Sequence, residues 1–190
     1  MDIKQYAKEN HVPIMLDEGI EFLLQYIKDH NIKHILELGT AIGYSSIRMA
    51  KIADDIYIDT IEINQDMYNQ ALININNENL QDRISVHLID ALEFDTNKQY
   101  DLVFVDAAKG KYPKYLERFS KNASLFIFDN LEFHGMVDNP EMTKNRNTKA
   151  LLRKIRNFRD TIIEDDRYDC TYYKHIGDGV LVLKIKGIQK

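Results

Sequence analysis

Short apolar runs alternate along the chain with longer segments in which apolar residues recur every three or four positions. The short runs are rich in β-branched and aromatic residues, which predicts strands at 34–38, 56–62, 84–89, 100–105 and 124–128. Helical spacing is found at 14–28, 45–51, 66–76, 113–119 and 151–162. This alternation predicts an α/β fold around a parallel sheet.

The pattern changes after residue 167. Two β-rich runs, 168–174 and 180–186, flank a turn that contains Gly177, Asp178 and Gly179, which predicts an antiparallel hairpin. We find no linker, internal repeat or low-complexity tract. Residues 1–190 are therefore expected to form a single domain, large enough for a core that needs no disulfide or metal.

Each of the five strand-like runs ends in an acidic residue. In an open parallel sheet, ligands bind beyond the carboxyl ends of the strands. One acid at the end of a strand is common, whereas five in succession favour a binding site at one rim. These acids are Glu37, Glu62, Asp90, Asp106 and Asp129.

The first strand leads into a turn framed by Gly39 and Gly43, after which Ser45 opens a helix. Glycines let the backbone approach a ligand closely, and a helix N-terminus offers N–H groups to an anion. A dinucleotide site requires G-x-G-x-x-G, whereas this turn reads G-T-A-I-G and follows Glu37, which would crowd a pyrophosphate. Glu37 suits the ammonium group of S-adenosylmethionine, with the carboxylate of that cofactor at Ser45. The alternative is an ordinary strand-to-helix turn without a ligand.

The cysteine content and the apolar runs of the chain indicate in which cellular compartment to expect the protein. Cys170 is the single cysteine, so no internal disulfide can form, as is usual in a reducing cytoplasm. The first residues lack the apolar core of a signal peptide, and no apolar run approaches the length of a bilayer span. We therefore expect a cytoplasmic protein without a membrane partner.

The formal net charge is −5, but residues 143–159 contain seven basic residues and no acid. The rest of the chain is therefore strongly acidic. A solvated helix face is the ordinary explanation of such a charge run, and a surface that binds phosphates is the alternative.

Three segments together resemble the metal-dependent O-methyltransferases of the catechol and caffeoyl-CoA type: Glu37 to Ala50, Val105 to Lys109 and Phe128 to Asn130. The resemblance covers nearly the whole chain. It implies a Rossmann-like class I methyltransferase fold, with a seven-stranded, mostly parallel sheet, a C-terminal antiparallel hairpin and helices on both faces. Within this family the chain looks most similar to the bacterial tRNA 5-hydroxyuridine methyltransferases, which methylate a modified wobble uridine.

The resemblance implies a set of residues for S-adenosylmethionine. Glu62 matches the acceptor of both ribose hydroxyls, Asp90 and the Ala91 N–H match the adenine site, and Met15 matches the segment that closes over the cofactor. Met15 is also an ordinary core residue by its type. The whole implied set is Met15, Glu37, Gly39, Gly43, Tyr44, Ser45, Glu62, Asp90, Ala91 and Asp106.

The resemblance also implies a metal site. Asp106, Asp129 and Asn130 match the ligands of the family, and two carboxylates with an amide oxygen suit Mg²⁺. A metal there lowers the pKa of a substrate hydroxyl. Asp106 and Lys109 are the expected catalytic residues, with Lys109 in the position of the proton acceptor. An Asx turn at 129–130 and a solvated Lys109 are the alternatives. Ala107 and Ala108 replace the His-Trp pair of catechol enzymes, which weakens a catechol substrate.

We therefore expect a Mg²⁺-assisted methyltransferase that converts 5-hydroxyuridine in tRNA to 5-methoxyuridine. Its expected partners are the tRNA anticodon loop and a second copy of the chain in a homodimer. The runner-up is an O-methyltransferase of a small catechol or phenol, and outside this class stand a nicotinamide oxidoreductase and a catalytically silent RNA-binding module. The expected phosphate contacts are Arg146, Lys149, Arg153 and Arg156, with Lys111 and Lys114.

Overall fold

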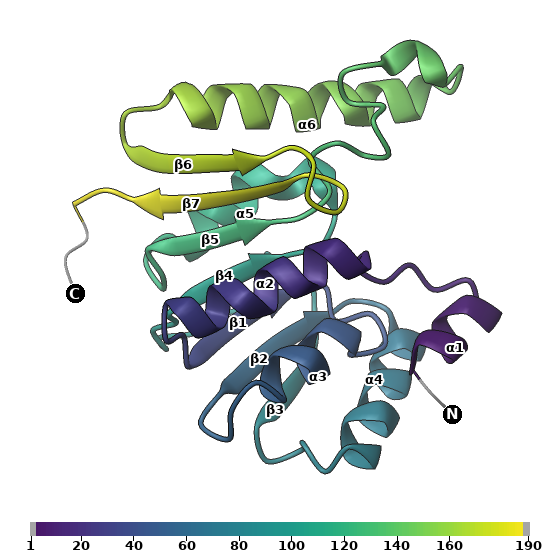
Figure 1. The fold of residues 1–190 in the computed structure, drawn as a ribbon, viewed down its shortest axis with the longest axis vertical. Coiled ribbons are helices and arrows are strands. Elements are labelled where there is room, and N and C mark those ends of the chain that lie inside the picture. Colours follow the sequence, from purple (N-terminus) through teal and green to yellow (C-terminus); the bar gives the residue numbers. More distant parts are fainter. Residues whose placement is uncertain (1–2, 188–190) are drawn as a thin grey trace.

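The computed structural model describes residues 3–187, which form a seven-stranded sheet with helices on both faces (Figure 1). The strand order is β3-β2-β1-β4-β5-β7-β6, and β7 alone among the described strands runs opposite to the others. The α/β fold and the hairpin are confirmed.

The helices are α1 (Ile3–Glu9), α2 (Asp17–Asp29), α3 (Tyr44–Ala50), α4 (Gln65–Asn77), α5 (Tyr112–Phe119) and α6 (Arg146–Glu164), with short 3₁₀ turns η1 (Lys109–Lys111) and η2 (Pro140–Met142). The strands are β1 (His34–Leu38), β2 (Tyr57–Glu62), β3 (Ile84–Leu88), β4 (Leu102–Val105), β5 (Leu125–Phe128), β6 (Tyr168–Tyr173) and β7 (Val180–Ile185).

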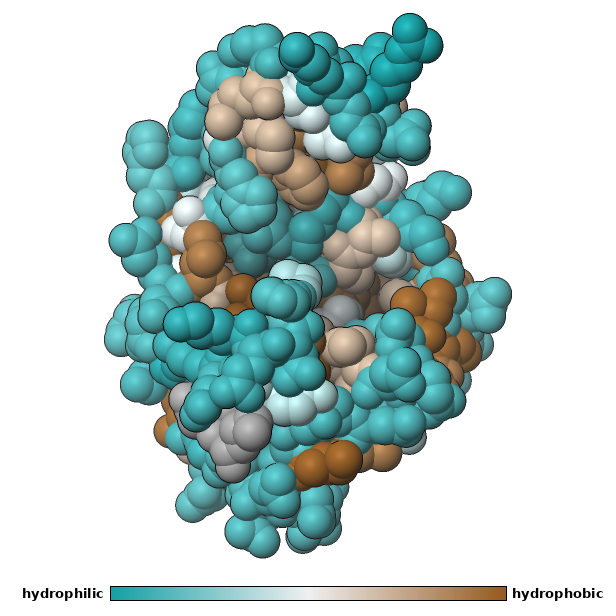
Figure 2. Space-filling view, turned by 90° about the vertical axis from the view of Figure 1, so that its right-hand side faces the viewer, coloured by the Kyte–Doolittle hydropathy of each residue, from teal (hydrophilic) through white to brown (hydrophobic). Residues whose placement is uncertain are grey.

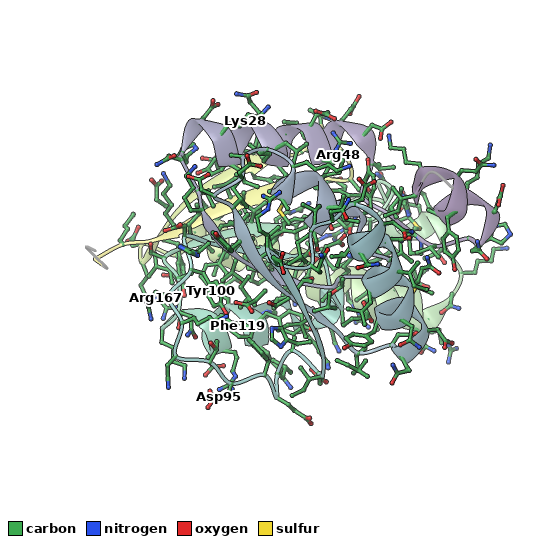
Figure 3. All side chains as sticks on the ribbon, turned by 90° about the horizontal axis from the view of Figure 1, so that it is seen from below. Lys28, Arg48, Asp95, Tyr100, Phe119 and Arg167 are labelled. Carbon is green, nitrogen blue, oxygen red and sulfur yellow. The ribbon has the colours of Figure 1, made fainter. Side chains whose placement is uncertain are left out.

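The two faces of the sheet carry separate cores, because successive strand residues point to opposite sides. Ile35 of β1 belongs to the core beneath α2, α3 and α4, whereas Leu36 belongs to the core with α5 and α6. Figure 3 shows this division, with Lys28 of α2 and Arg48 of α3 on one side and Phe119 of α5 on the other. Strands buried on both faces explain the nearly unbroken apolar runs in the sequence.

The helices differ from expectation at three places, one of which is α2, expected from residue 14 and observed from Asp17. The sequence pattern did not predict α1. Helix α6 begins at Arg146, because the side chain of Asn145 caps its first turn by accepting from the N–H groups of Asn147 and Thr148. Arg146 is therefore the first helical residue, whereas the sequence placed it in the preceding loop.

The order of the strands in the sheet determines where the candidate site lies. The chain moves outward from β1 through β2 to β3 and then returns to pair β4 with β1. The loops after β1 and β4 therefore leave the sheet side by side, at the point where the direction of winding reverses. Ligands of open α/β sheets bind at such a switch point.

No helix within residues 3–187 is long and apolar enough to cross a bilayer.

Candidate active site

A cavity of about 650 Å³ opens at the carboxyl ends of the strands, where the switch point lies. Figure 2 faces this end of the molecule and shows a hollow near its centre, with apolar and polar surface around it. Its walls come from the loops after β1, β2, β3, β4 and β5 and from residues 13–16. The volume is within the range that holds a cofactor or a drug-sized ligand.

Glu62, at the end of β2, lines the cavity. Its Oε2 accepts a hydrogen bond of 2.8 Å from the N–H of Ala41 in the glycine turn. Its Oε1 accepts from the N–H groups of Ile63, at 2.9 Å, and Asn64, at 2.8 Å. Three backbone donors therefore fix the carboxylate, which keeps further lone pairs for a diol.

Asp90 and Ala91, which follow β3, line the neighbouring part of the cavity. The Leu92 N–H, which donates to Oδ1 of Asp90, and the Lys111 ammonium, 2.9 Å from Oδ2, hold the pKa of Asp90 below its usual range. Lys111 was expected to bind phosphates. Its ammonium pairs with Asp90 in this structure, and a phosphate contact of Lys111 stays a prediction.

Met15 lies on the wall of the cavity and also belongs to the core, with 5% of its surface exposed. Its position is therefore compatible with both alternatives that the sequence left open, a residue that closes over the cofactor and an ordinary core residue. Gly39 lies on the same wall, and its N–H donates to the carbonyl of Ile61.

Glu37 does not reach the cavity, which corrects the expectation that it holds the cofactor ammonium. Its side chain is fully buried beneath α3, and its carboxylate accepts hydrogen bonds from the hydroxyls of Ser45, Ser46 and Thr60. Burial raises its pKa to about 7. The reason is register, because β1 continues to Leu38 and Glu37 faces the helix layer.

Three further residues of the expected cofactor set lie outside the cavity wall. Ser45 donates its hydroxyl to Glu37 and is therefore engaged below the turn. Tyr44 is buried, and its hydroxyl accepts from Arg48 at 3.0 Å. Gly43 faces Ala71 of α4. These residues support the glycine turn from beneath.

Asp106, Asp129 and Asn130 follow β4 and β5 at the centre of the sheet. Burial, and secondly the negative charge of Asp106, raise the pKa of Asp129 to about 7. Oδ1 of Asp129 is a buried oxygen without a hydrogen-bond partner. Within residues 3–187 no three His, Cys, Asp or Glu side chains converge into a metal-binding group. The set of two carboxylates and one amide nevertheless fits a hard cation, because a cation would satisfy the unpartnered oxygen and relieve the repulsion.

Lys109 lies in η1 on the wall of the cavity, with 18% of its side chain exposed. Its Nζ is 2.6 Å from Oδ1 of Asp106. This position beside the candidate metal ligands is where a proton acceptor or a stabilising cation would act. The alternative of a solvated surface lysine is therefore wrong, and a catalytic role of Lys109 stays a prediction.

The basic segment divides into two groups in the structure. Arg156 donates to the carbonyl of Val137, and Arg159, with 8% of its surface exposed, lies 3.2 Å from Glu132 and 2.8 Å from Asp138. One guanidinium nitrogen of Arg156 is therefore engaged within the fold, and its contact with tRNA stays a prediction. The remaining basic side chains are exposed and form no ion pair within the described residues: Lys144, Arg146, Lys149, Arg153 and Lys154.

The sequence did not single out three residues that line the cavity: Phe133, His134 and Asp178. Phe133 and His134 lie in the loop after β5, and Asp178 lies in the hairpin turn. A D-G turn predicts a hairpin, but it does not show that the turn reaches a site built from other strands. Only the pairing of β5 with β7 brings them together.

Comparisons with known proteins show the family of the chain. A family model described as O-methyltransferase matches residues 2–186. Caffeoyl-CoA O-methyltransferase 2 of Petunia hybrida is 31% identical over 188 residues, which cover 88% of this chain and 74% of the petunia protein. Two solved structures are also similar. A Staphylococcus aureus protein with a provisional assignment as a caffeoyl-CoA O-methyltransferase has 32% identity and a TM-score of 0.91, over 96% of this chain and 90% of that one.

The O-methyltransferase from Bacillus cereus, solved in complex with SAH, has 25% identity and a TM-score of 0.80, over 96% of this chain and 88% of that one. These similarities extend over the strands and loops that build the cavity. The family model alone spans nearly the whole chain. The chain therefore belongs to the O-methyltransferase family.

Proposed function

We propose that this O-methyltransferase uses S-adenosylmethionine to methylate the 5-hydroxyl group of 5-hydroxyuridine at the wobble position of tRNA, assisted by Mg²⁺. The cofactor part is supported by the cavity at the switch point, with the fixed Glu62 carboxylate facing it and Asp90 beside it. The Bacillus cereus relative binds SAH in the same fold.

The tRNA substrate is supported by one observation, the unpaired basic surface beside the cavity. Helix α6 packs against η1, which carries Lys109 and Lys111 of the cavity wall. A Cβ built on Gly110 of η1 would lie 3.6 Å from Cδ of Lys154, so the stem of this lysine borders the wall. Exposed Lys and Arg side chains next to a site give affinity for a phosphate backbone.

In the proposed reaction the hydroxyl oxygen of the substrate attacks the methyl carbon of S-adenosylmethionine. The S–CH₃ bond breaks to leave S-adenosylhomocysteine, and the hydroxyl proton passes to solvent. Asp106, Asp129 and Asn130 would hold Mg²⁺, which would supply positive charge that lowers the pKa of the substrate hydroxyl. Lys109 adds a second positive charge in the cavity, and Asp106 fixes its ammonium through the 2.6 Å contact. Glu62 and Asp90, which line the same cavity, would bind the ribose and the adenine of the cofactor.

A triple variant, Arg146→Ala, Lys149→Ala and Arg153→Ala, tests the substrate. The parent should convert 5-hydroxyuridine to 5-methoxyuridine in tRNA from a strain that lacks the modification, as measured by nucleoside mass spectrometry. Each lost phosphate contact should reduce the slope of log affinity against log salt by about 0.7–0.9. The affinity for S-adenosylmethionine, measured by calorimetry, should stay unchanged. A triple variant with the parent's salt dependence would reject the basic surface as the tRNA contact.

A small catechol or phenol is the second candidate substrate. Phe133 and Tyr115 on the cavity wall favour it, because aromatic walls bind a planar ring. The same assay, with caffeoyl-CoA and catechol in place of tRNA, separates the two. Turnover of either small substrate, unaffected by the triple substitution and without activity on tRNA, would reverse the order of the candidates.

The metal is tested apart from the substrate. Removal of divalent ions with EDTA, or the variant Asp129→Asn, should suppress turnover far more than it suppresses cofactor binding. A chelated enzyme that methylates at the untreated rate would show that no metal takes part.

A further inference from the structure

Asp178 is a buried acid that has no role in the proposed function. It lies in the turn between β6 and β7, with 6% of its surface exposed. Its Oδ1 accepts a hydrogen bond of 2.6 Å from the N–H of His134, and its Oδ2 lies 3.4 Å from Nδ2 of Asn130. Its main-chain carbonyl accepts from the N–H of Glu132 at 2.8 Å. One residue of the hairpin therefore binds three positions of the loop after β5.

That loop has a backbone that does not hold its shape unaided. Asn130, Phe133 and His134 have φ angles of 60°, 47° and 57°. Residues other than glycine adopt this left-handed region uncommonly, although Asn and His do so more often than most, and the conformation persists where the surroundings fix it. Asp178 bonds the first and the last of the three, so it holds the loop at both ends.

The contact with Asn130 also orients an amide. An asparagine side chain has one amino group, which donates, and one carbonyl oxygen, which accepts or binds a cation. The amino group is directed to the Asp178 carboxylate, so the carbonyl oxygen is the end left for the cavity that Asn130 lines. A hard cation binds that oxygen and never the amino group.

The turn that contains Asp178 packs closely against neighbouring segments of the fold. A Cβ built on Gly179 would lie 2.9 Å from the backbone nitrogen of Glu132, and one built on Gly177 would lie 3.1 Å from Cα of Gly19 in α2. Both glycines have positive φ angles. The hairpin turn is therefore packed closely between α2 and the loop after β5, against the backbone of Gly19 and against the backbone and side chain of Glu132.

We propose that Asp178 is a positioning residue, which turns the carbonyl oxygen of Asn130 toward a divalent cation and fixes the loop 130–134 in its left-handed form. This inference rests on the proposed metal site, in which Asn130 is a ligand. It assigns no direct contact with the cation to Asp178.

Asp178→Asn tests the proposal, because asparagine keeps the shape but offers only one accepting oxygen for two donors. Calorimetric titration of the enzyme with Mg²⁺ and Mn²⁺, without substrate, should show affinity reduced about 10- to 100-fold, as is usual when a group behind a metal ligand is lost. Cofactor affinity should change less than twofold. Asp169→Asn, an exposed acid of β6, is the matched control and should leave metal affinity unchanged.

A double-mutant comparison shows whether Asp178 acts through Asn130. In an Asn130→Ala background, Asp178→Asn should weaken metal binding no further. Additive losses would overturn the positioning role. Hydrogen exchange of residues 130–137, measured without metal, should be faster in Asp178→Asn than in the parent. Exchange and metal affinity equal to the parent's would also overturn the proposal.

The two failures are distinguishable. If the parent binds Mg²⁺ and Mn²⁺ and Asp178→Asn binds them equally well, the inference fails and the proposed metal site stands. If the parent binds neither ion, the metal site is rejected, and the positioning role of Asp178 is rejected with it.

Discussion

Gly39 lies directly against the main chain of Asp106, so closely that a Cβ built on Gly39 would be 2.8 Å from the Asp106 carbonyl carbon and closer still to its oxygen. The two residues come from the loops after β1 and β4, on the two sides of the switch point. The contact joins the wall of the cofactor cavity to the first candidate metal ligand, and it exists only because Gly39 has no side chain.

Gly39→Ala should therefore be strongly destabilising. Its φ angle of 102° adds backbone strain to the clash, and together they should lower the free energy of unfolding by about 2–4 kcal/mol. Gly135→Ala is the matched control, since Gly135 has φ of 76° and nothing within 4 Å of a built Cβ, and it should lose only about 1 kcal/mol. Urea unfolding of both variants measures the difference. Equal losses would show that strain alone matters and that the contact does not.

Glu62→Gln should weaken cofactor binding. An amide replaces one carboxylate oxygen with an amino group, which faces backbone N–H donors and cannot accept from a ribose hydroxyl. We expect the dissociation constant for S-adenosylmethionine to rise about 10- to 100-fold, as for loss of a hydrogen bond to a charged group. Calorimetry measures it, with exposed Glu117→Gln as the control. An unchanged constant would remove Glu62 from the binding site.

Arg159 and Arg153 should differ strongly in their response to the same substitution, although both belong to one basic segment. Arg159→Met leaves the buried Glu132 without its cationic partner and with only the Tyr172 hydroxyl as a side-chain donor, which should cost about 3–5 kcal/mol in unfolding free energy. Arg153→Met removes an exposed side chain and should change stability by less than about 0.5 kcal/mol. Thermal and urea unfolding of the two variants compare them. A small effect at Arg159 would mean that its ion pairs contribute nothing to the fold.

Glu37 should make stability depend on pH. Burial raises its pKa from 4.5 to about 7, although the hydroxyls of Ser45, Ser46 and Thr60 act in the opposite direction. The folded protein therefore keeps a proton that the unfolded chain has released. The contribution of Glu37 to stability is complete below pH 4.5 and is lost as the pH rises through 7, by about 3 kcal/mol.

The variant Glu37→Gln isolates this effect. Asp129, whose pKa is also raised, titrates in parent and variant alike, so the difference between their stability curves belongs to Glu37. The variant should lose less stability than the parent between about pH 5 and 8 in urea titrations. Parallel curves would show that the buried carboxyl does not titrate in this range.

The sequence predicted the sheet because each strand carries its own apolar pattern, and it predicted Glu62, Asp90 and Asp106 at the cavity because strand ends meet at one rim. The prediction was wrong for Glu37. Strand β1 continues for one more residue, to Leu38, so the side chain of Glu37 points to one face of the sheet and not to the rim. Alternation along 34–38 contains this signal, because Glu37 shares the face of Ile35.

The division of the basic segment was also partly visible. Arg159 follows Leu152 by seven residues and precedes Ile162 by three, so helical spacing places it on the buried face of α6. The role of Asp178 has no such local signal. Its partners, Asn130 and His134, are 48 and 44 residues away, and only the completed sheet shows which turn meets which loop.

The sheet order β5-β7-β6 has a consequence for synthesis of the chain. Strand β6 precedes β7 in the chain, yet β7 lies between it and β5. While the ribosome has made β6 but not β7, the edge of β5 is unpaired and β6 has no neighbour in the sheet. The nascent protein therefore exposes two strand edges that favour aggregation and proteolysis, and a chaperone that shields them would act in that interval.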